Sequence, residues 1–283
     1  MKLFSQRKGF KPIKSVIQKD SMDIDLRNGL WNASTLSYWD QVTTDWIYNH
    51  KNIATLFKRL WLNYFKQPID TLNNYWPKAY KKIRDYFFNC EWYEVYDFIE
   101  FVANNYPNDY DRTNSKFMKF CNSVLEQELS AYRFVGGRIT QITSKEEISG
   151  IEEALEVSNP LKGVNTHLKR ALDLLADRKA PDYRNSIKES ISAVEAICKL
   201  ITKEKKATLG QALKKIGDKV SLHFALQSAF SSLYGYTNDT GGIRHALLDE
   251  PNLSFEDAKF MLVSCSAFVN YLISKASKAG IKI

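Results

Sequence analysis

The stretch Asp182–Ile201, DYRNSIKESISAVEAICKLI, decides the fold class of this chain. Its apolar residues recur every three or four positions, the spacing that lines one face of an α-helix; they are Ile187, Ile191, Val194, Cys198 and Ile201. Asp182 is the predicted N-cap, because its carboxylate can accept hydrogen bonds from the free N–H groups of the first turn. An amphipathic helix of this length needs other helices to cover its apolar face.

Similar stripes on both sides predict those helices. They fall at Leu161–Leu175, from Thr208 to near Gly217, at Leu222–Leu233, and from Ser254 to Leu272. Thr208 with Gln211, and Ser254 with Asp257, have the spacing of residues that cap a helix start. These stripes and caps therefore predict that the C-terminal half is a bundle of four to five helices.

One polar segment, Tyr236–Ala246 (YTNDTGGIRHA), interrupts this bundle. Gly241 and Gly242 permit positive φ, and the residues after them could form a short helix whose first N–H groups bind phosphate. Arg244 would supply a permanent cation, and His245 a group that exchanges protons near neutral pH. Metal-free RNA cleavage needs such a pair: a base for the 2′-OH proton and a cation for the charge on the phosphate. A structural loop with both side chains satisfied locally is the alternative interpretation.

The N-terminal half is rich in aromatic residues and contains every tryptophan of the chain. Helical stripes run through residues 53–65, 80–88, 93–102 and 117–129, and Pro68, Pro77 and Pro107 separate them. Aromatic side chains bury large areas, so we interpret these stripes as core and not as a ligand platform. The half is predicted to be a second helical bundle.

A small β-hairpin is predicted at Tyr132–Ile142, where β-favouring residues flank the turn pair Gly136–Gly137. An isolated hairpin is marginal, so we expect it to pack on a helical body and join the two halves. Ser144 and Glu147 then have the spacing of a capping box that starts the next helix.

Composition narrows the class of protein further. The 283 residues, 44% hydrophobic and 25% charged, suit two globular domains, and the net charge of +8 favours nucleic acid as a partner, although a basic excess can also serve solubility alone. The four cysteines are far apart, so we expect four buried, reduced thiols. P-loop and Gly-x-Ser-x-Gly motifs are absent, as are a signal peptide and a membrane-length apolar run, so we expect a cytoplasmic protein.

Five segments together resemble the AbiJ-type abortive-infection proteins, whose C-terminal domains belong to the HEPN superfamily. They are MKLFSQRKGFKPI (1–13), DLRNGLWN (25–32), ELSAYRFVGGRITQIT (128–143), DYRNSIKESISAV (182–194) and GGIRHA (241–246). The resemblance implies an all-α chain with an AbiJ-like helical domain at 1–143, ending in the hairpin, and a HEPN-like helical domain at 144–283. It also implies a metal-independent endoribonuclease toxin of anti-phage defence, without cofactor. Such a toxin would be a homodimer, respond to a phage-derived or cellular trigger, and cut RNA, with tRNA as one candidate, by 2′-OH attack.

The resemblance also suggests which residues form the site. HEPN ribonucleases of this kind carry an Arg, then four to six residues, then a His; here Arg244 directly precedes His245, and Asn238 or Asp239 stands about six residues earlier. The expected catalytic residues are His245, Arg244 and Glu189, and the expected substrate-binding residues are Arg184, Asn185, Asn238, Asp239, Gly241 and Gly242.

Alternatives remain at this stage. Arg184, Asn185 and Glu189 could equally form a solvated helix face or an N-terminal cap network. Because the motif departs from the family pattern, the domain could be a catalytically inactive RNA-binding, protein-interaction or sensor module, or a helical scaffold. We assign no role to His50, His167 or His223, and the lysines between Lys203 and Lys219 could track RNA or simply be solvated.

Overall fold

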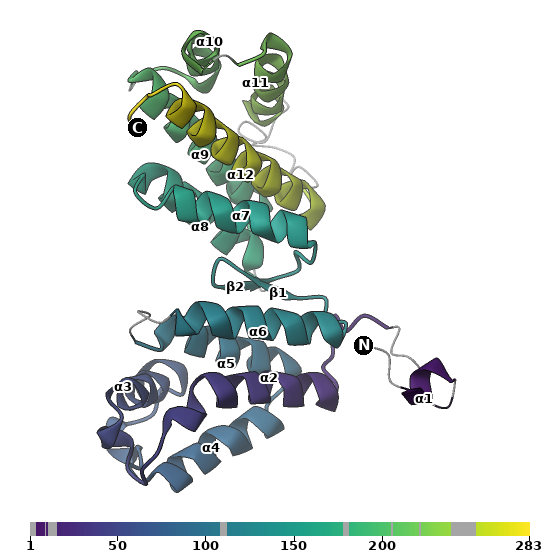
Figure 1. The fold of residues 1–283 in the computed structure, drawn as a ribbon, viewed down its shortest axis with the longest axis vertical. Coiled ribbons are helices and arrows are strands. Elements are labelled where there is room, and N and C mark those ends of the chain that lie inside the picture. The colour runs from purple at the N-terminus through teal and green to yellow at the C-terminus, as the bar shows by residue number, and fades with distance from the viewer. Residues whose placement is uncertain are drawn as a thin grey trace, which may run out of the picture. The chain divides into compact units, whose positions relative to one another are not determined.

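The computed structural model describes residues 4–8, 10, 16–107, 112–177, 181–204, 206–220, 222–238 and 253–283. In these ranges the chain is almost wholly helical, with one two-stranded antiparallel sheet, so the predicted all-α class is confirmed (Figure 1). The chain divides into two compact units, Met1–Gln141 and Ile142–Ile283.

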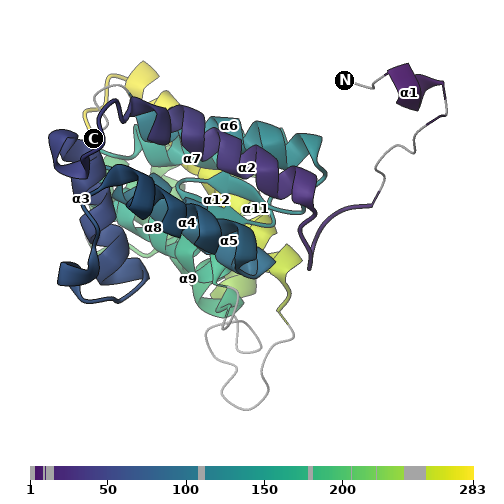
Figure 2. The same cartoon turned by 90° about the horizontal axis from the view of Figure 1, so that it is seen from below.

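The first unit is built from helices and short helical turns. Its helices are α1 (Phe4–Arg7), α2 (Ile24–Ser37), α3 (Lys51–Arg59), α4 (Trp76–Asn89), α5 (Trp92–Asn105) and α6 (Thr113–Gln127); 3-10 turns cover Trp39–Gln41, Ile47–Asn49 and Ile69–Thr71, and a π-helical turn covers Leu60–Tyr64. No stripe predicted α2, although it lies beside α6 in Figures 1 and 2. Gly29 makes this close packing possible, since a Cβ there would lie 2.5 Å from Val124 Cγ1.

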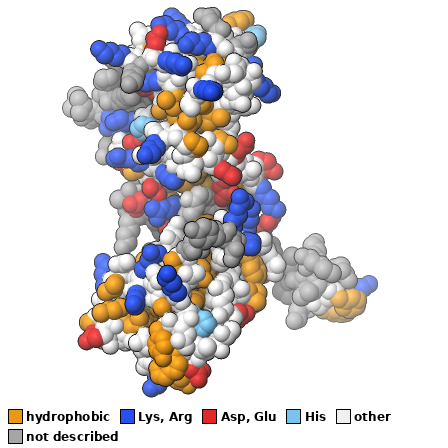
Figure 3. Space-filling model, turned by 60° about the vertical axis from the view of Figure 1, so that its left-hand side comes forward, with side chains coloured by type: hydrophobic (Ala, Val, Ile, Leu, Met, Phe, Trp, Pro, Cys, Tyr) orange, Lys and Arg blue, Asp and Glu red, His pale blue; other side chains and the backbone are white. Residues whose placement is uncertain are grey.

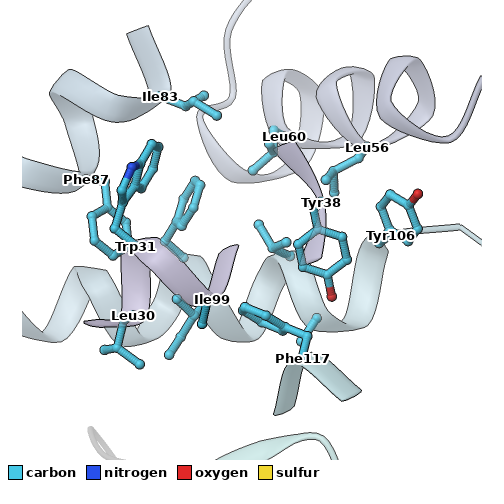
Figure 4. Packing of buried hydrophobic residues seen from close by; sticks show 14 of the residues in the cluster. Leu30, Trp31, Tyr38, Leu56, Leu60, Ile83, Phe87, Ile99, Tyr106 and Phe117 are labelled. Carbon is cyan, nitrogen blue, oxygen red and sulfur yellow. The ribbon is translucent and has the colours of Figure 1, made fainter. Parts of the chain in front are cut away.

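Aromatic rings fill the core of this unit, as the stripes predicted. Trp31 packs on Phe87 with ring centroids 5.0 Å apart (Figure 4). The ring centroid of Tyr38 lies 4.9 Å from that of Phe117 and 4.7 Å from that of Tyr106. Trp46 is an exception, because 44% of its surface is exposed and it stacks on the exposed Tyr48. Trp46 lies outside the predicted helical stripes.

The predicted hairpin is confirmed as β1 (Arg133–Val135) and β2 (Arg138–Thr140). Gly136 and Gly137 both have positive φ, 54° and 88°, which the tight connecting turn requires. Helices α5 and α6 hold the hairpin: Glu100 Oε2 accepts a hydrogen bond from Ile139 N at 2.7 Å, and Asn122 Oδ1 accepts one from Phe134 N at 2.7 Å. These contacts make it part of the first unit.

The second unit contains six helices in its described residues. They are α7 (Lys145–Val157), α8 (Lys162–Ala176), α9 (Tyr183–Thr202), α10 (Leu209–Val220), α11 (Phe224–Asn238) and α12 (Phe255–Lys278). Helix α9 is central, because it packs against α8, α10, α11 and α12 and buries its predicted apolar stripe. Three of the predicted site residues lie on α9 outside this stripe: Arg184, Asn185 and Glu189.

Helix α12 is long and apolar enough, by length and composition alone, to cross a membrane. It is an exception to the expected absence of any apolar segment of that length. One face of the helix, which includes Met261, Leu262, Val269 and Leu272, is buried within the unit, where α12 packs on α7, α8 and α9, whereas Phe260 is 57% exposed. The helix is therefore partly buried by its own unit.

The predicted helix caps form with one correction. Asp182 Oδ1 accepts from Asn185 N at 2.9 Å, and Ser254 and Asp257 make the reciprocal capping box. At α7 only half of the box exists: Ser144 Oγ accepts from Glu147 N at 3.3 Å, while the carboxylate of Glu147 pairs with Lys259 of α12 at 3.1 Å. A tertiary ion pair has replaced the local contact.

The cysteines are free thiols, and three of them are buried as expected: Cys121, Cys198 and Cys265. Burial raises the pKa of Cys198 and raises that of Cys265 to about 12, so both stay protonated and unreactive at neutral pH. Cys90 is only half-buried, which departs from the expectation, and its thiol lies 3.9 Å from the Arg27 guanidinium.

Candidate functional site

The polar face of α9 begins with its own cap. Asn185 follows Asp182 by three residues, and its Nδ2 donates to Asp182 Oδ2 at 2.6 Å while its backbone N donates to Oδ1. The cap network that the sequence allowed is therefore present. Substrate binding by Asn185 stays a prediction.

One turn further along α9, the side chain of Glu189 contacts α8 and is only 16% exposed. His167 Nδ1 donates to Glu189 Oε2 at 2.6 Å, and Arg170 Nε lies 3.4 Å from Glu189 Oε1. Both partners come from α8, where their spacing of three residues places them on one helix face. We call these three residues the α8–α9 cluster.

Small residues on α9 explain why the two helices approach closely enough to form this cluster. Ser186 and Ser190 are fully buried, and Ser186 Oγ donates to the backbone oxygen of Ala171 on α8 at 2.8 Å. Residue numbers rise on α8 as they fall on α9 across these contacts, so the two helices are antiparallel. The apolar stripe faces the core, and Glu189 stands at the edge of the helix interface.

The carboxylate of Glu189 determines which ring nitrogen of His167 carries the proton. An ionised carboxylate only accepts hydrogen bonds, so the proton on His167 sits at Nδ1 and a neutral ring keeps its lone pair on Nε2. The His167 side chain is 37% exposed and that of Arg170 is 69% exposed. The cluster can therefore exchange a proton and offer a forked cation to a ligand in solvent.

The other predicted site residues divide into two groups. Arg184 lies in the first turn of α9, and Asn238 is the last residue of α11. Asp239, Gly241, Gly242, Arg244 and His245 lie outside the described residues, so convergence of Arg244 and His245 with Glu189 stays a prediction. Sequence reasoning missed His167, because its partner is 22 residues away and only helix pairing brings them together.

Basic side chains do not gather into one patch on the face shown in Figure 3, where Lys and Arg are interspersed with Asp and Glu. Part of the lysine-rich stretch is used internally, since Lys219 Nζ donates to the backbone oxygen of Thr202 at 3.0 Å and Lys215 pairs with Glu204. Nor do the described residues contain a group of three or more His, Cys, Asp or Glu side chains arranged to hold a metal ion.

Comparison with known proteins identifies one similarity. The sequence model of AbiJ N-terminal domain 4 matches residues 2–157, which includes the first unit and extends through α7. No curated protein and no solved structure matches the chain. The match ends before α8, so it does not include the α8–α9 cluster.

Proposed function

Because the chain belongs to the AbiJ family, whose N-terminal domain 4 matches more than half of it, we propose that it acts in anti-phage abortive infection as an RNA-cleaving toxin. In this proposal the second unit is a HEPN-like domain that cuts RNA, with tRNA as one candidate substrate, and no metal takes part. The first unit would sense a phage-derived or cellular trigger.

The observation that carries the proposal is the environment of Glu189. A solvated helix face would leave this carboxylate in water, but it is largely buried and shared by an imidazole and a guanidinium. Glu189 is one of the expected catalytic residues, so its burial beside these two side chains supports a place for it in the site. The net charge of +8 adds an overall attraction for a polyanion.

The proposed reaction is attack of the ribose 2′-oxygen on the adjacent phosphorus. The 2′-OH proton passes to the imidazole of His245 as the O2′–P bond forms, and Arg244 stabilises the charge on the phosphate oxygens. The P–O5′ bond then breaks, and the departing oxygen takes up a proton. The products are a 2′,3′-cyclic phosphate and a 5′-hydroxyl end.

Incubation of the purified protein with tRNA and other structured RNA in EDTA tests this proposal. We expect cleavage, cyclic-phosphate ends and a loss of roughly 10²- to 10⁴-fold in rate for His245→Ala. The matched control is His223→Ala, which removes an exposed histidine at the start of α11. RNA binding with strong salt dependence but no cleavage would instead identify a non-catalytic RNA-binding module.

The proposal includes a two-fold homodimer, in which the same surface of each copy forms the interface. Light scattering should give twice the monomer mass at working concentrations. A monomer that cleaves RNA at full rate would remove the dimer from the proposal.

A further inference from the structure

The α8–α9 cluster holds a second imidazole that the proposed reaction has not used. We infer that this cluster is itself a phosphodiester site, in which Arg170 binds a phosphate oxygen, His167 donates a proton to the leaving 5′-oxygen, and Glu189 positions His167. This inference rests on the proposed RNA cleavage.

The His167 ring is held in an orientation that suits proton transfer. Glu189 is held at an interface of two core helices, so its carboxylate has little freedom, and its 2.6 Å hydrogen bond fixes the His167 ring through Nδ1. Within the described ranges Nε2 of His167 has no hydrogen-bond partner, although 37% of the side chain is exposed. A ring fixed at one nitrogen and available at the other is arranged for proton transfer.

The charge of the α8–α9 cluster suits a phosphodiester. With His167 neutral, the single charges of Glu189 and Arg170 cancel, and the cluster has no net charge. Arg170 uses Nε for Glu189, so its terminal N–H groups remain to form the forked contact that suits a phosphate. A bound phosphodiester adds one negative charge, which favours protonation of His167 at Nε2. A protonated ring beside the bound phosphate is the acid that the second half of the reaction needs.

The proton balance of the reaction requires an acid as well as a base. Attack by the 2′-oxygen releases one proton, and departure of the 5′-oxygen consumes another. The Nε2 proton of His167 passes to O5′ as the P–O5′ bond breaks, which leaves a neutral ring that regains a proton from water.

Binding is tested first, on the unmodified protein. An all-deoxy oligonucleotide lacks the 2′-OH and cannot be cut, so it serves as the probe in a ¹⁵N NMR titration of the histidine rings, with His167→Asn used for assignment. We expect the His167 Nε2 signal to move toward the protonated form on binding. Arg170→Ala should weaken binding about tenfold, a change of about 1.4 kcal/mol, whereas Lys162→Ala, at the exposed start of α8, should not.

Glu189 is tested by the same spectra, because a positioning role has a spectroscopic signature. In the unliganded protein we expect the proton of His167 on Nδ1. Glu189→Gln should mix the two tautomers while the far-UV circular dichroism stays helical. An unchanged tautomer in Glu189→Gln would show that the carboxylate does not position the ring.

The acid role is tested with a substrate whose leaving group needs no proton. RNA with sulfur in place of the 5′-bridging oxygen has such a leaving group, so His167→Asn should lose roughly 10²-fold or more on ordinary RNA but little on the sulfur substrate. A variant that is merely misfolded would lose activity on both. Equal loss on both substrates by a variant whose far-UV circular dichroism is unchanged, or no loss on either, overturns the acid role.

These outcomes separate the two proposals. If the unmodified protein cuts RNA and His167→Asn cuts it equally well, the cluster inference is wrong and the proposed function stands. If the protein cuts no RNA, the proposed function fails and the acid role fails with it; the NMR titration then decides whether the cluster binds phosphodiesters. No response of the His167 ring to the oligonucleotide overturns the site in either case.

Discussion

The first unit packs around aromatic rings, whereas the second packs around aliphatic and small side chains on α9. Rings such as Trp31, Phe57 and Phe87 fill the spaces between short helices and turns. In the second unit the buried residues of α9 include Ala193 and Ser190, and they allow long helices to approach one another closely.

This difference determines what happens to polar groups. In the first unit some polar ends of buried rings are satisfied internally, as between Tyr64 and Tyr86 at 2.9 Å and between Tyr96 and Ser130 at 2.8 Å, whereas Trp39 Nε1 has no hydrogen-bond partner among the described residues. In the second unit the close approach of α8 and α9 places charged side chains at the edge of a helix interface, partly open to solvent.

The largest expected effect is in the aromatic core. Trp61 is 1% exposed, so Trp61→Ala should lower the free energy of unfolding of the first unit by about 3–5 kcal/mol. The neighbouring Leu62 is 52% exposed, and Leu62→Ala should change it by less than about 0.5 kcal/mol. Urea unfolding followed by tryptophan fluorescence measures this unit alone, because every tryptophan lies in it. Equal effects of the two substitutions would break the comparison.

A smaller effect is expected from pH. Burial raises the pKa of Tyr96 to about 12 from 10.0. Between these values the unfolded chain has lost this proton and the folded unit keeps it, so stability should fall as pH rises from 10 to 12, by on the order of 2 kcal/mol. Tyr96→Phe should flatten this part of the curve, measured as urea midpoints by tryptophan fluorescence. If stability falls as steeply between pH 10 and 12 in Tyr96→Phe as in the unmodified protein, other groups cause the loss of stability.

Substitutions at two helical glycines should have effects of opposite sign, the smaller of them at Gly163. Gly29→Ala places a Cβ against Val124 and should destabilise the first unit by about 1–3 kcal/mol. Gly163 in α8 has open space around it, so Gly163→Ala should stabilise the second unit by about 0.4–1 kcal/mol. Unfolding followed by tryptophan fluorescence measures the change in the first unit, and unfolding followed by far-UV circular dichroism measures the change in the second. A stabilising Gly29→Ala would show that Val124 moves aside without cost.

Most of the fold could be predicted from the sequence, because helices with strong apolar periodicity carry their own signal. Helix α9 and its Asp182 cap, the Ser254 cap of α12 and the Gly136–Gly137 turn form as predicted. Helix α2 was missed because its apolar residues do not form a clear stripe, and its stability depends on packing against α6. Glu147 was misassigned because Lys259, its partner, is 112 residues away.

By itself the sequence determined an all-α chain with an aromatic first half, an aliphatic second half and a polar, glycine-containing interruption before the last helix. Local patterns suffice for this, since periodicity and caps act over a few residues. Only the tertiary structure decided that Glu189 is shared by His167 and Arg170. The reason is physical: a contact between two helices depends on which of their faces pack together, and a single helix contains no information about the side chains that it will meet.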